Sequence, residues 1–169
     1  MIRAALPCDV PAITHIYNQA VRARNCTCDL HEKNLEDRTR WYQTHGNATP
    51  IFVFEPGGKV LGYAYLSAYR EGRPAVATTA EVSFYVDFAA HGKGIGSALL
   101  AYAIEAAKRL GYAHLLAIVI ETNVGSVALL RKFGFVEWGR LPGVVIINSD
   151  CCSHLYYGLN LFDEGDSHA

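Results

Sequence analysis

The chain has 169 residues, of which 51% are hydrophobic and 18% are charged, and it has a formal net charge of -1 and a pI near 6.6. This balance excludes a disordered chain, and it disfavours a nucleic-acid-binding protein because such a protein needs a more basic pI. No stretch approaches the roughly 20 apolar residues of a membrane-spanning helix, so we expect one domain over residues 1–169 with neither nucleic acid nor membrane as a partner.

The first 42 residues predict a strand and two helices. Residues 2–5 are apolar enough for a short strand. Asp9 is typical of a helix N-cap, and Pro11 falls in the first turn, where a missing N–H group costs little. Asn34 and Asp37 resemble a capping box at the start of a second helix.

Three strands follow in the central part of the chain. Residues 51–54 and 60–66 are apolar runs, and Pro56-Gly57-Gly58 between them indicates a hairpin turn. Residues 81–86 are rich in residues that favour strands.

The remaining elements alternate between helices and strands. Residues 92–96 are glycine-rich and lead into an Ala/Leu-rich helix that ends before Gly111. The later elements are a buried strand over 114–120, a helix over 126–132, and closing strands over 136–141 and 155–161. The order predicts a mixed α/β fold, with antiparallel hairpins first and a right-handed crossover after the glycine loop.

A glycine-rich turn between a strand and a helix N-terminus is suited to bind an anion, because its backbone N–H groups converge and the helix dipole favours negative charge. A tight turn without a ligand is the alternative interpretation. The P-loop spacing is absent because Lys93 precedes the last glycine of the loop. The dinucleotide-binding spacing fails because its third glycine would fall at Ser97.

Two motifs carry a more specific resemblance. The segment His91-Gly92-Lys93-Gly94-Ile95-Gly96 resembles the acetyl-CoA-binding motif of the GNAT superfamily of N-acetyltransferases, and Asn123-Val124-Gly125-Ser126 followed by Phe133-Gly134-Phe135 resembles its second signature. Segments 16–21, 79–81 and 139–141 are similar to the phosphinothricin and methionine-sulfone acetyltransferase branch.

The resemblance implies a central, mostly antiparallel twisted sheet of about seven strands, flanked by about four helices. It implies acetyl-CoA as the cosubstrate, a small amine or amino acid as the acceptor, and a homodimer. It places the following residues around the cofactor: Phe84, Tyr85 and Val86 on the pantetheine, the amides of Gly92, Lys93, Gly94, Ile95, Gly96 and Ser97 on the pyrophosphate, and Asn123 on the cofactor arm.

Glu81 is the candidate catalytic residue, because an ammonium must lose a proton before its nitrogen can attack a thioester directly. A nearby carboxylate can accept this proton directly or through water, and we expect the route through water. It matches the family's glutamate in an otherwise apolar strand, and partial burial would raise its pKa toward a useful value. A carboxylate on a solvent-facing strand, or one that pairs with the substrate's cation, is the alternative. Arg73, on the preceding loop, is a candidate for binding a substrate carboxylate, with Arg70 as a rival.

Several positions depart from the family pattern. His91 stands in place of Arg or Gln, and Leu130 stands where relatives have a Tyr or His that could protonate the leaving thiolate. A thiol pKa of about 8.5 makes the thiolate a tolerable leaving group without such an acid. Residues 146–154 lack the family's Lys-Phe-Gly-x-Trp-x-Asp stretch, so the acceptor can differ. A protein N-terminal or lysine acetyltransferase, and a CoA-binding module with little catalysis, therefore remain alternatives.

The cysteine pattern bears on the compartment. The sequence contains five cysteines, Cys8, Cys26, Cys28, Cys151 and Cys152. Their number and spacing match no disulfide framework, so we expect reduced thiols in the cytoplasm. A zinc site built from segments 26–28 and 151–154 is the alternative, but the usual ligand spacing is missing, and we expect no metal.

Overall fold

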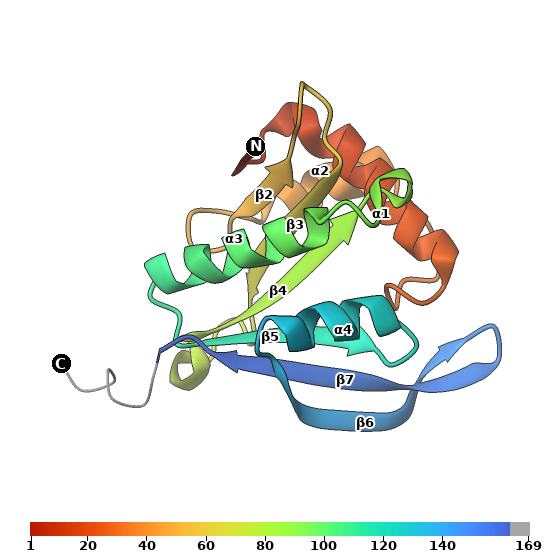
Figure 1. Ribbon diagram of the computed structural model, residues 1–169, viewed down its shortest axis with the longest axis vertical. Coiled ribbons are helices and arrows are strands. Elements are labelled where there is room, and N and C mark those ends of the chain that lie inside the picture. Colours follow the sequence, from red (N-terminus) through yellow and green to blue (C-terminus); the bar gives the residue numbers. More distant parts are fainter. Residues whose placement is uncertain (163–169) are drawn as a thin grey trace.

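A computed structural model describes residues 1–162, which form one seven-stranded sheet and four α-helices (Figure 1). The strands are β1 (Ile2–Ala4), β2 (Ile51–Phe54), β3 (Gly62–Ala68), β4 (Thr79–Val86), β5 (His114–Ile120), β6 (Val136–Ile147) and β7 (Asp150–Asn160). The helices are α1 (Val10–Ala23), α2 (Leu35–Gln43), α3 (Ile95–Arg109) and α4 (Val124–Lys132). Residues 163–169 lie outside the described part, so a single domain over 1–169 stays a prediction.

The strand order is β1-β2-β3-β4-β5-β7-β6. Among the described strands, β4 and β5 form the one parallel pair, and every other neighbouring pair is antiparallel. The prediction of a mixed, mostly antiparallel α/β fold is therefore confirmed. The parallel pair is connected through α3, as the strand–helix–strand pattern predicted.

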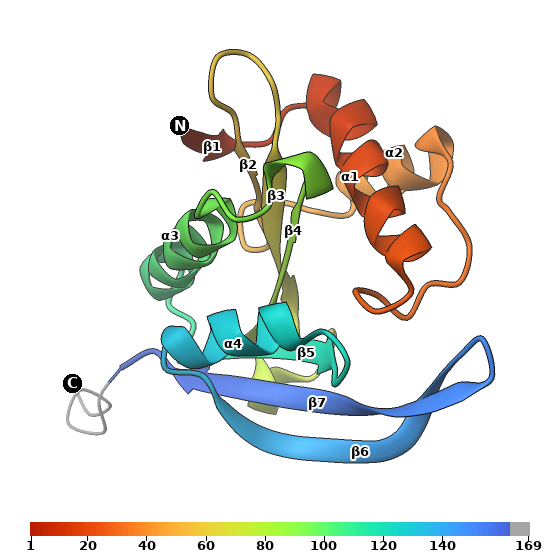
Figure 2. The ribbon, with the colours of Figure 1, turned by 45° about the vertical axis from the view of Figure 1, so that its right-hand side comes forward.

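Two helical layers cover the sheet, with α1 and α2 on one face and α3 and α4 on the other (Figure 2). Leu99 and Ala103 of α3 pack in one core with Val82 of β4, whereas Ile13 and Tyr63 belong to a second core under α1. Because successive side chains of a strand point to opposite faces, the odd-numbered residues of β4 share the α1/α2 face.

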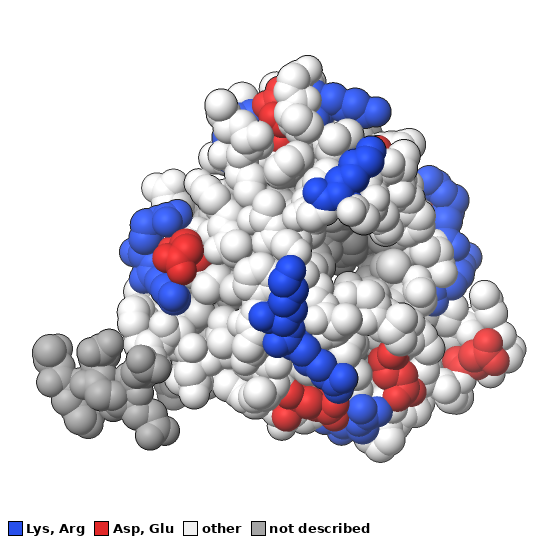
Figure 3. All heavy atoms as spheres, in the orientation of Figure 1, with Lys and Arg blue, Asp and Glu red and all other residues white. Residues whose placement is uncertain are grey.

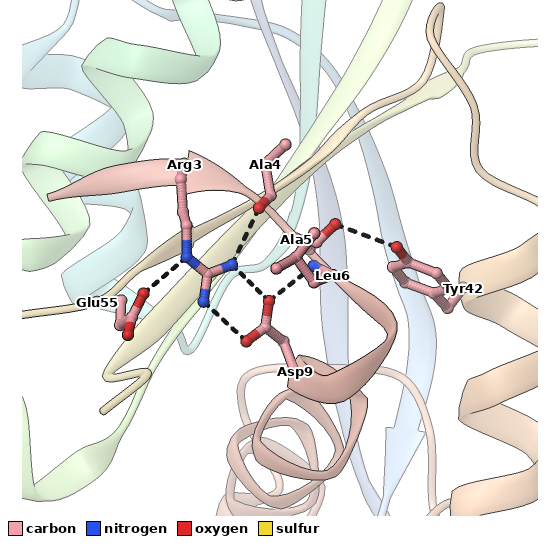
Figure 4. A network of polar contacts seen from close by, with 7 residues as sticks. All are labelled: Arg3, Ala4, Ala5, Leu6, Asp9, Tyr42 and Glu55. Atoms are coloured by element: carbon pink, nitrogen blue, oxygen red, sulfur yellow. Dashed lines mark hydrogen bonds and ion pairs between the residues drawn. The ribbon is translucent and has the colours of Figure 1, made fainter. Parts of the chain in front are cut away.

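Arg3 connects the N-terminal elements through ion pairs (Figure 4). Its guanidinium contacts the Asp9 carboxylate at 2.7 Å and the Glu55 carboxylate at 2.6 Å. Asp9 also accepts a hydrogen bond from the Leu6 amide at 2.7 Å. The Arg3 guanidinium lowers the pKa of this carboxyl group below its ordinary value. Asp9 is the N-cap residue of α1, as predicted, but its side chain makes no capping hydrogen bond to the helix because the carboxylate accepts from Arg3 and the Leu6 amide.

The second predicted cap is confirmed in part. The Asn34 side chain accepts a hydrogen bond from the Asp37 amide at 2.8 Å, which satisfies one free N–H group of the first turn of α2. The Asp37 carboxylate pairs with Arg40 at 2.6 Å, so it stabilises the helix surface instead of completing a capping box.

The C-terminal strands are longer than predicted. They meet in a hairpin at Asn148 and Ser149, both with positive φ, 52° and 71° respectively. Asn tolerates this conformation better than most residues. Register shifts between Glu137 and Gly139, and between Leu141 and Val145, interrupt the alternation of side chains along β6. These irregularities break the alternation that would indicate a strand, so the sequence pattern does not predict a hairpin over 146–154.

Gly158 supports an aromatic contact on β6 and gives a test of this packing. A Cβ atom at Gly158 would lie 2.0 Å from the Trp138 ring, so Gly158→Ala must displace that ring. We expect a loss of about 1–3 kcal/mol in the free energy of unfolding, the usual cost of overpacking. Thermal melts and tryptophan emission would measure it, with Gly139→Ala as the control, where a Cβ finds ordinary contact at 3.9 Å. An unchanged melt for Gly158→Ala would contradict this packing.

Candidate functional site

The two parallel strands part halfway along their length. The β4–β5 ladder pairs Thr79 with His114, Ala80 with Leu115 and Glu81 with Leu116, and it ends there. Beyond this point β4 stays paired with β3, and β5 stays paired with β7. Residues 82–86 and 117–120 face each other across the gap, and their backbones therefore form no ladder hydrogen bonds with each other.

A cleft of about 700 Å³ occupies the gap. Its walls come from β4 and β5, and its ends come from the glycine loop, the start of α4 and the segment after α1. Residues that line it include Val82, Ser83, Phe84, Tyr85, Val86, Gly92, Gly94, Ile95, Gly96, Ser97, Ala117, Ile118, Val119 and Asn123. Figure 3 shows the molecule hollowed on this face, with Lys or Arg side chains near the rim. An elongated, partly anionic ligand fits such a cleft.

The glycine loop shapes the anion-binding end of the cleft. Gly92 and Gly94 both have φ +76°, a conformation that favours glycine, and a Cβ atom on either would meet no atom within 4 Å. Gly94 is the N-cap of α3, so the first N–H groups of the helix lack intrahelical partners. Those N–H groups and the helix dipole attract an anion such as a pyrophosphate.

Polar contacts within the segment before the loop, and one from α1, fix the entry to this loop. The Asp87 carboxylate accepts from the Ala89 amide at 3.0 Å, and the Gln19 side chain accepts from the Phe88 amide at 2.9 Å. The His91 ring, in place of the family's Arg or Gln, lies 3.0 Å from the Val86 carbonyl oxygen. The loop is thereby held in position before any ligand binds.

Gly96 allows α4 to approach the loop closely. A Cβ atom there would lie 3.2 Å from the Leu129 side chain. Asn123 caps α4 by accepting from the Ser126 amide at 3.2 Å, and it lines the cleft. The two sequence motifs, which are far apart in the chain, therefore meet at one cleft.

The structure brings most of the predicted cofactor residues together, with one exception. Phe84 to Val86, Gly92, Gly94 to Ser97, and Asn123 all line the cleft. Lys93 does not, since its ammonium group donates to the Ala89 carbonyl at 3.4 Å. Arg73 is exposed at the start of the 3-10 helix Pro74–Val76 and also lies outside the lining. The roles of these residues stay predictions.

Glu81 lies just below the point where the strands part. Burial raises the pKa of its carboxyl group above the ordinary value, as a general base for an amine requires. Its side chain is on the α1/α2 face of β4 and is not part of the cleft lining. Ser83, two residues further along the same face, does line the cleft.

Several lining residues were not predicted from the sequence. Asn25 and Cys26 reach the cleft from the segment after α1, and Ile118 reaches it from β5. Nothing in the local pattern of these residues signals a site, because only the tertiary fold brings them there. Leu130 also lines the cleft, where it is almost fully buried and offers no proton donor.

The cysteine-containing segments approach each other in part. Cys28 Sγ lies 3.8 Å from His154 Nε2. Within residues 1–162, no group of three or more His, Cys, Asp or Glu side chains is placed to hold a metal ion. In the same part of the chain, no helix is long and apolar enough to cross a membrane.

A cleft between parting parallel strands, closed by a glycine-rich helix N-terminus, suits an extended ligand that carries an anionic group at one end. Residues 11–135 match the acetyltransferase (GNAT) family, and the chain belongs to that family. The predicted family and the predicted acetyltransferase fold are thus confirmed.

Individual relatives refine this picture. The L-methionine sulfoximine/L-methionine sulfone acetyltransferase of Pseudomonas aeruginosa is 35% identical over 147 residues, which cover 85% of this chain and 84% of the relative. An N-acetyltransferase from Staphylococcus aureus Mu50 has a similar structure, with a TM-score of 0.92, 38% identity and coverage of 96% and 98% of the two chains. A phosphinothricin acetyltransferase from Sinorhizobium meliloti, solved with acetyl-CoA, gives a TM-score of 0.87 at 30% identity, with coverage of 95% and 87%.

Gly94→Asp tests the anion site at the start of α3. The substitution puts a side chain with negative charge where a pyrophosphate would lie, so we expect a loss of CoA affinity of at least about tenfold, which corresponds to 1.4 kcal/mol. Isothermal calorimetry on the folded variant would measure it. Gly111→Asp is the matched control, because Gly111 has a similar φ of +81° and equally open surroundings at the opposite end of α3. Unchanged affinity in Gly94→Asp would contradict the placement.

Proposed function

We propose that this chain transfers an acetyl group from acetyl-CoA to the amine of a small amino-acid-like substrate. The observation that carries the proposal is the cleft between β4 and β5, which ends at the glycine-rich N-terminus of α3. Relatives named for phosphinothricin and methionine sulfone acetylation support the choice of acceptor.

The cleft supplies groups that suit the pyrophosphate and the pantetheine arm of acetyl-CoA. The amides of residues 92–97 suit the pyrophosphate. The open edge of Phe84 to Val86 offers backbone N–H and C=O groups that can pair with the amides of the pantetheine arm, as an added strand would. Asn123 lines the same cleft at the start of α4, where it can contact this arm.

The proposed chemistry is direct attack of the amine on the thioester. The ammonium form of the acceptor gives one proton to the Glu81 carboxylate, and the neutral nitrogen attacks the carbonyl carbon. The C–S bond then breaks, and the second nitrogen proton neutralises the thiolate. A leaving thiol with a pKa of about 8.5 needs no strong acid, which suits a site where Leu130 replaces a proton donor.

A panel screen tests the proposed function. The protein is incubated with acetyl-CoA and amino acids (methionine sulfone and methionine sulfoximine among them), simple amines, or peptides with free N-termini or lysines. Released thiol is then measured. Turnover with amino acids supports the proposal. Turnover with peptides alone would assign a protein acetyltransferase, and binding of acetyl-CoA without any turnover would leave a CoA-binding module.

Glu81→Gln separates the possible roles of this carboxylate. A general base contributes roughly 100- to 10,000-fold, so we expect kcat to fall by that order while acetyl-CoA affinity stays unchanged. The wild-type rate should rise with pH as Glu81 loses its proton, at a pH above the ordinary carboxyl range because burial raises its pKa. The variant should lose this limb. A raised KM with little change in kcat would instead indicate an ammonium anchor, and unchanged kinetics would remove Glu81 from the site.

We further propose that the enzyme is a cytoplasmic homodimer. Its five cysteines are free, which fits a reducing compartment. The edge strand β6 exposes a row of apolar side chains, namely Val136, Trp138, Leu141, Val144 and Ile146. A second copy of the chain would cover this row, in keeping with the symmetric pairs that most oligomers form.

Light scattering tests the homodimer. We expect a mass twice that of the 18.5 kDa chain. Ile146→Glu, which puts a charge into the exposed row, should shift the protein toward the monomer. Leu110→Glu is the control, because Leu110 is also exposed but lies at the end of α3. A monomer mass for the wild-type chain at working concentration would refute this proposal.

A further inference from the structure

Glu81 lies two residues before the first residue on its face of β4 that lines the cleft, Ser83. Glu81 and Ser83 point to the same face, and positions two residues apart in a strand lie about 6.6 Å from each other. Ser83 lines the cleft, whereas Glu81 does not. A proton that leaves an amine in the cleft must therefore cross this distance before it reaches the carboxylate.

Tyr65, on the neighbouring strand β3, lies beside Ser83 and Glu81. It lies directly opposite Ser83 in the antiparallel register, and Glu81 is its diagonal neighbour on the same face. Directly opposite Cβ atoms lie about 4.5–5.5 Å apart, and diagonal neighbours lie about 7–8 Å apart, within reach of an aromatic side chain. Tyr65 can therefore adjoin both residues.

Aromatic packing fixes the Tyr65 ring. The ring centroids of Trp41 and His45, both on the α2 side, lie 5.1 Å and 5.4 Å from it in T-shaped arrangements. Tyr63 stacks on it from the same strand at 6.3 Å. A ring held on three sides keeps its hydroxyl in one place, and an ordered proton path requires this.

Charged and titratable groups surround the hydroxyl of Tyr65. Ser83 and Glu81 face it from β4, Arg38 from α2, and Asp29 from the segment between α1 and α2. Burial dominates and raises the pKa of the phenol, so it stays protonated and can act as a donor. Arg38 is itself buried against Trp41, with its guanidinium 3.7 Å from that ring. His45 is also half-buried, and burial lowers the pKa of its ring, which favours its neutral form.

We propose that the hydroxyls of Ser83 and Tyr65 relay the acceptor's proton from the cleft to Glu81, which rests on the proposed function above. The ammonium proton passes to Ser83 Oγ, the Ser83 proton passes to the Tyr65 oxygen, and the Tyr65 proton passes to the Glu81 carboxylate. Both hydroxyls are restored, the amine becomes neutral, and Glu81 gains one proton. The proton returns to solvent after the product leaves.

Tyr65→Phe tests the relay because it removes the hydroxyl and keeps the ring. We expect kcat to fall about 10- to 100-fold, less than a full general-base loss of roughly 100- to 10,000-fold because water can replace one hydroxyl. In the proposed relay the Tyr65 hydroxyl donates to the Glu81 carboxylate, and a carboxylate that loses a donor holds its proton more tightly, so the alkaline-rising limb of the rate should move to higher pH. Acetyl-CoA affinity should not change.

Matched variants separate the relay from general damage. Tyr112→Phe also removes one tyrosine hydroxyl, but that group donates to the Ala48 carbonyl at 2.8 Å, away from the cleft. It should retain wild-type kinetics. Ser83→Ala should lower kcat as Tyr65→Phe does, and Ser83→Thr, which keeps a hydroxyl, should restore much of it.

Two readouts make the outcome decisive. If the wild type acetylates an amine, Glu81→Gln is inactive and Tyr65→Phe has wild-type kcat and pH dependence, the relay is overturned and the proposed function stands. If the screen finds no acceptor, NMR titration of the Glu81 carboxyl carbon still tests the relay without turnover. A higher Glu81 pKa in Tyr65→Phe, but not in Tyr112→Phe, supports it. Identical pKa values in the wild type and Tyr65→Phe overturn it.

Discussion

The structure depends on the place where the β4–β5 ladder ends. Backbone N–H and C=O groups are costly to bury without partners, and residues 82–86 present such groups along one edge. The protein tolerates this edge because it borders an open cleft that water or an extended ligand can enter. An amide-bearing chain is the ligand best matched to it, since it can complete the interrupted ladder.

The strands can part because each has a second partner. β3 holds β4 along its whole length, from Ala68 opposite Ala80 to Gly62 opposite Val86. β7 holds β5 equally along the whole strand. Opening the cleft therefore costs only the β4–β5 hydrogen bonds beyond Glu81, and each half of the sheet keeps its other ladder. The glycine loop and α4 then close the ends of the gap, with Gly96 permitting their close contact.

Much of this organisation is encoded in local sequence. Local patterns identify the apolar run of β5, the Ala/Leu-rich α3 and the glycines before it, and they can be recognised without knowing the rest of the chain. The strand order is not local, but the glycine loop between a strand and a helix limits where a parallel pair can lie. That is why the sequence could indicate that the glycine loop lies at the N-terminus of α3, where it lines the cleft.

Other parts of the cleft and of the fold could not be predicted from local sequence. Asn25 and Cys26 line the cleft only because α1 crosses the sheet there, and the β6–β7 hairpin is obscured by its bulges. The position of Glu81 one step below the cleft also follows from the strand register and not from the sequence. The role of such residues depends on the face of the sheet and the strand position that they occupy, so it can be judged only from the assembled sheet.

The burial of Glu81 links function to stability. An unfolded chain exposes this carboxyl group and gives it an ordinary pKa, whereas burial raises the pKa in the folded protein. The folded state therefore holds the proton more tightly, so the contribution of Glu81 to stability is largest at low pH and declines as the pH rises from the unfolded-state pKa through the folded-state pKa. Above the folded-state pKa the buried carboxylate is ionised, and its burial is then a cost to the fold. The same burial makes it a stronger base than an exposed glutamate. A site that needed only structural stability would favour an uncharged residue at this position.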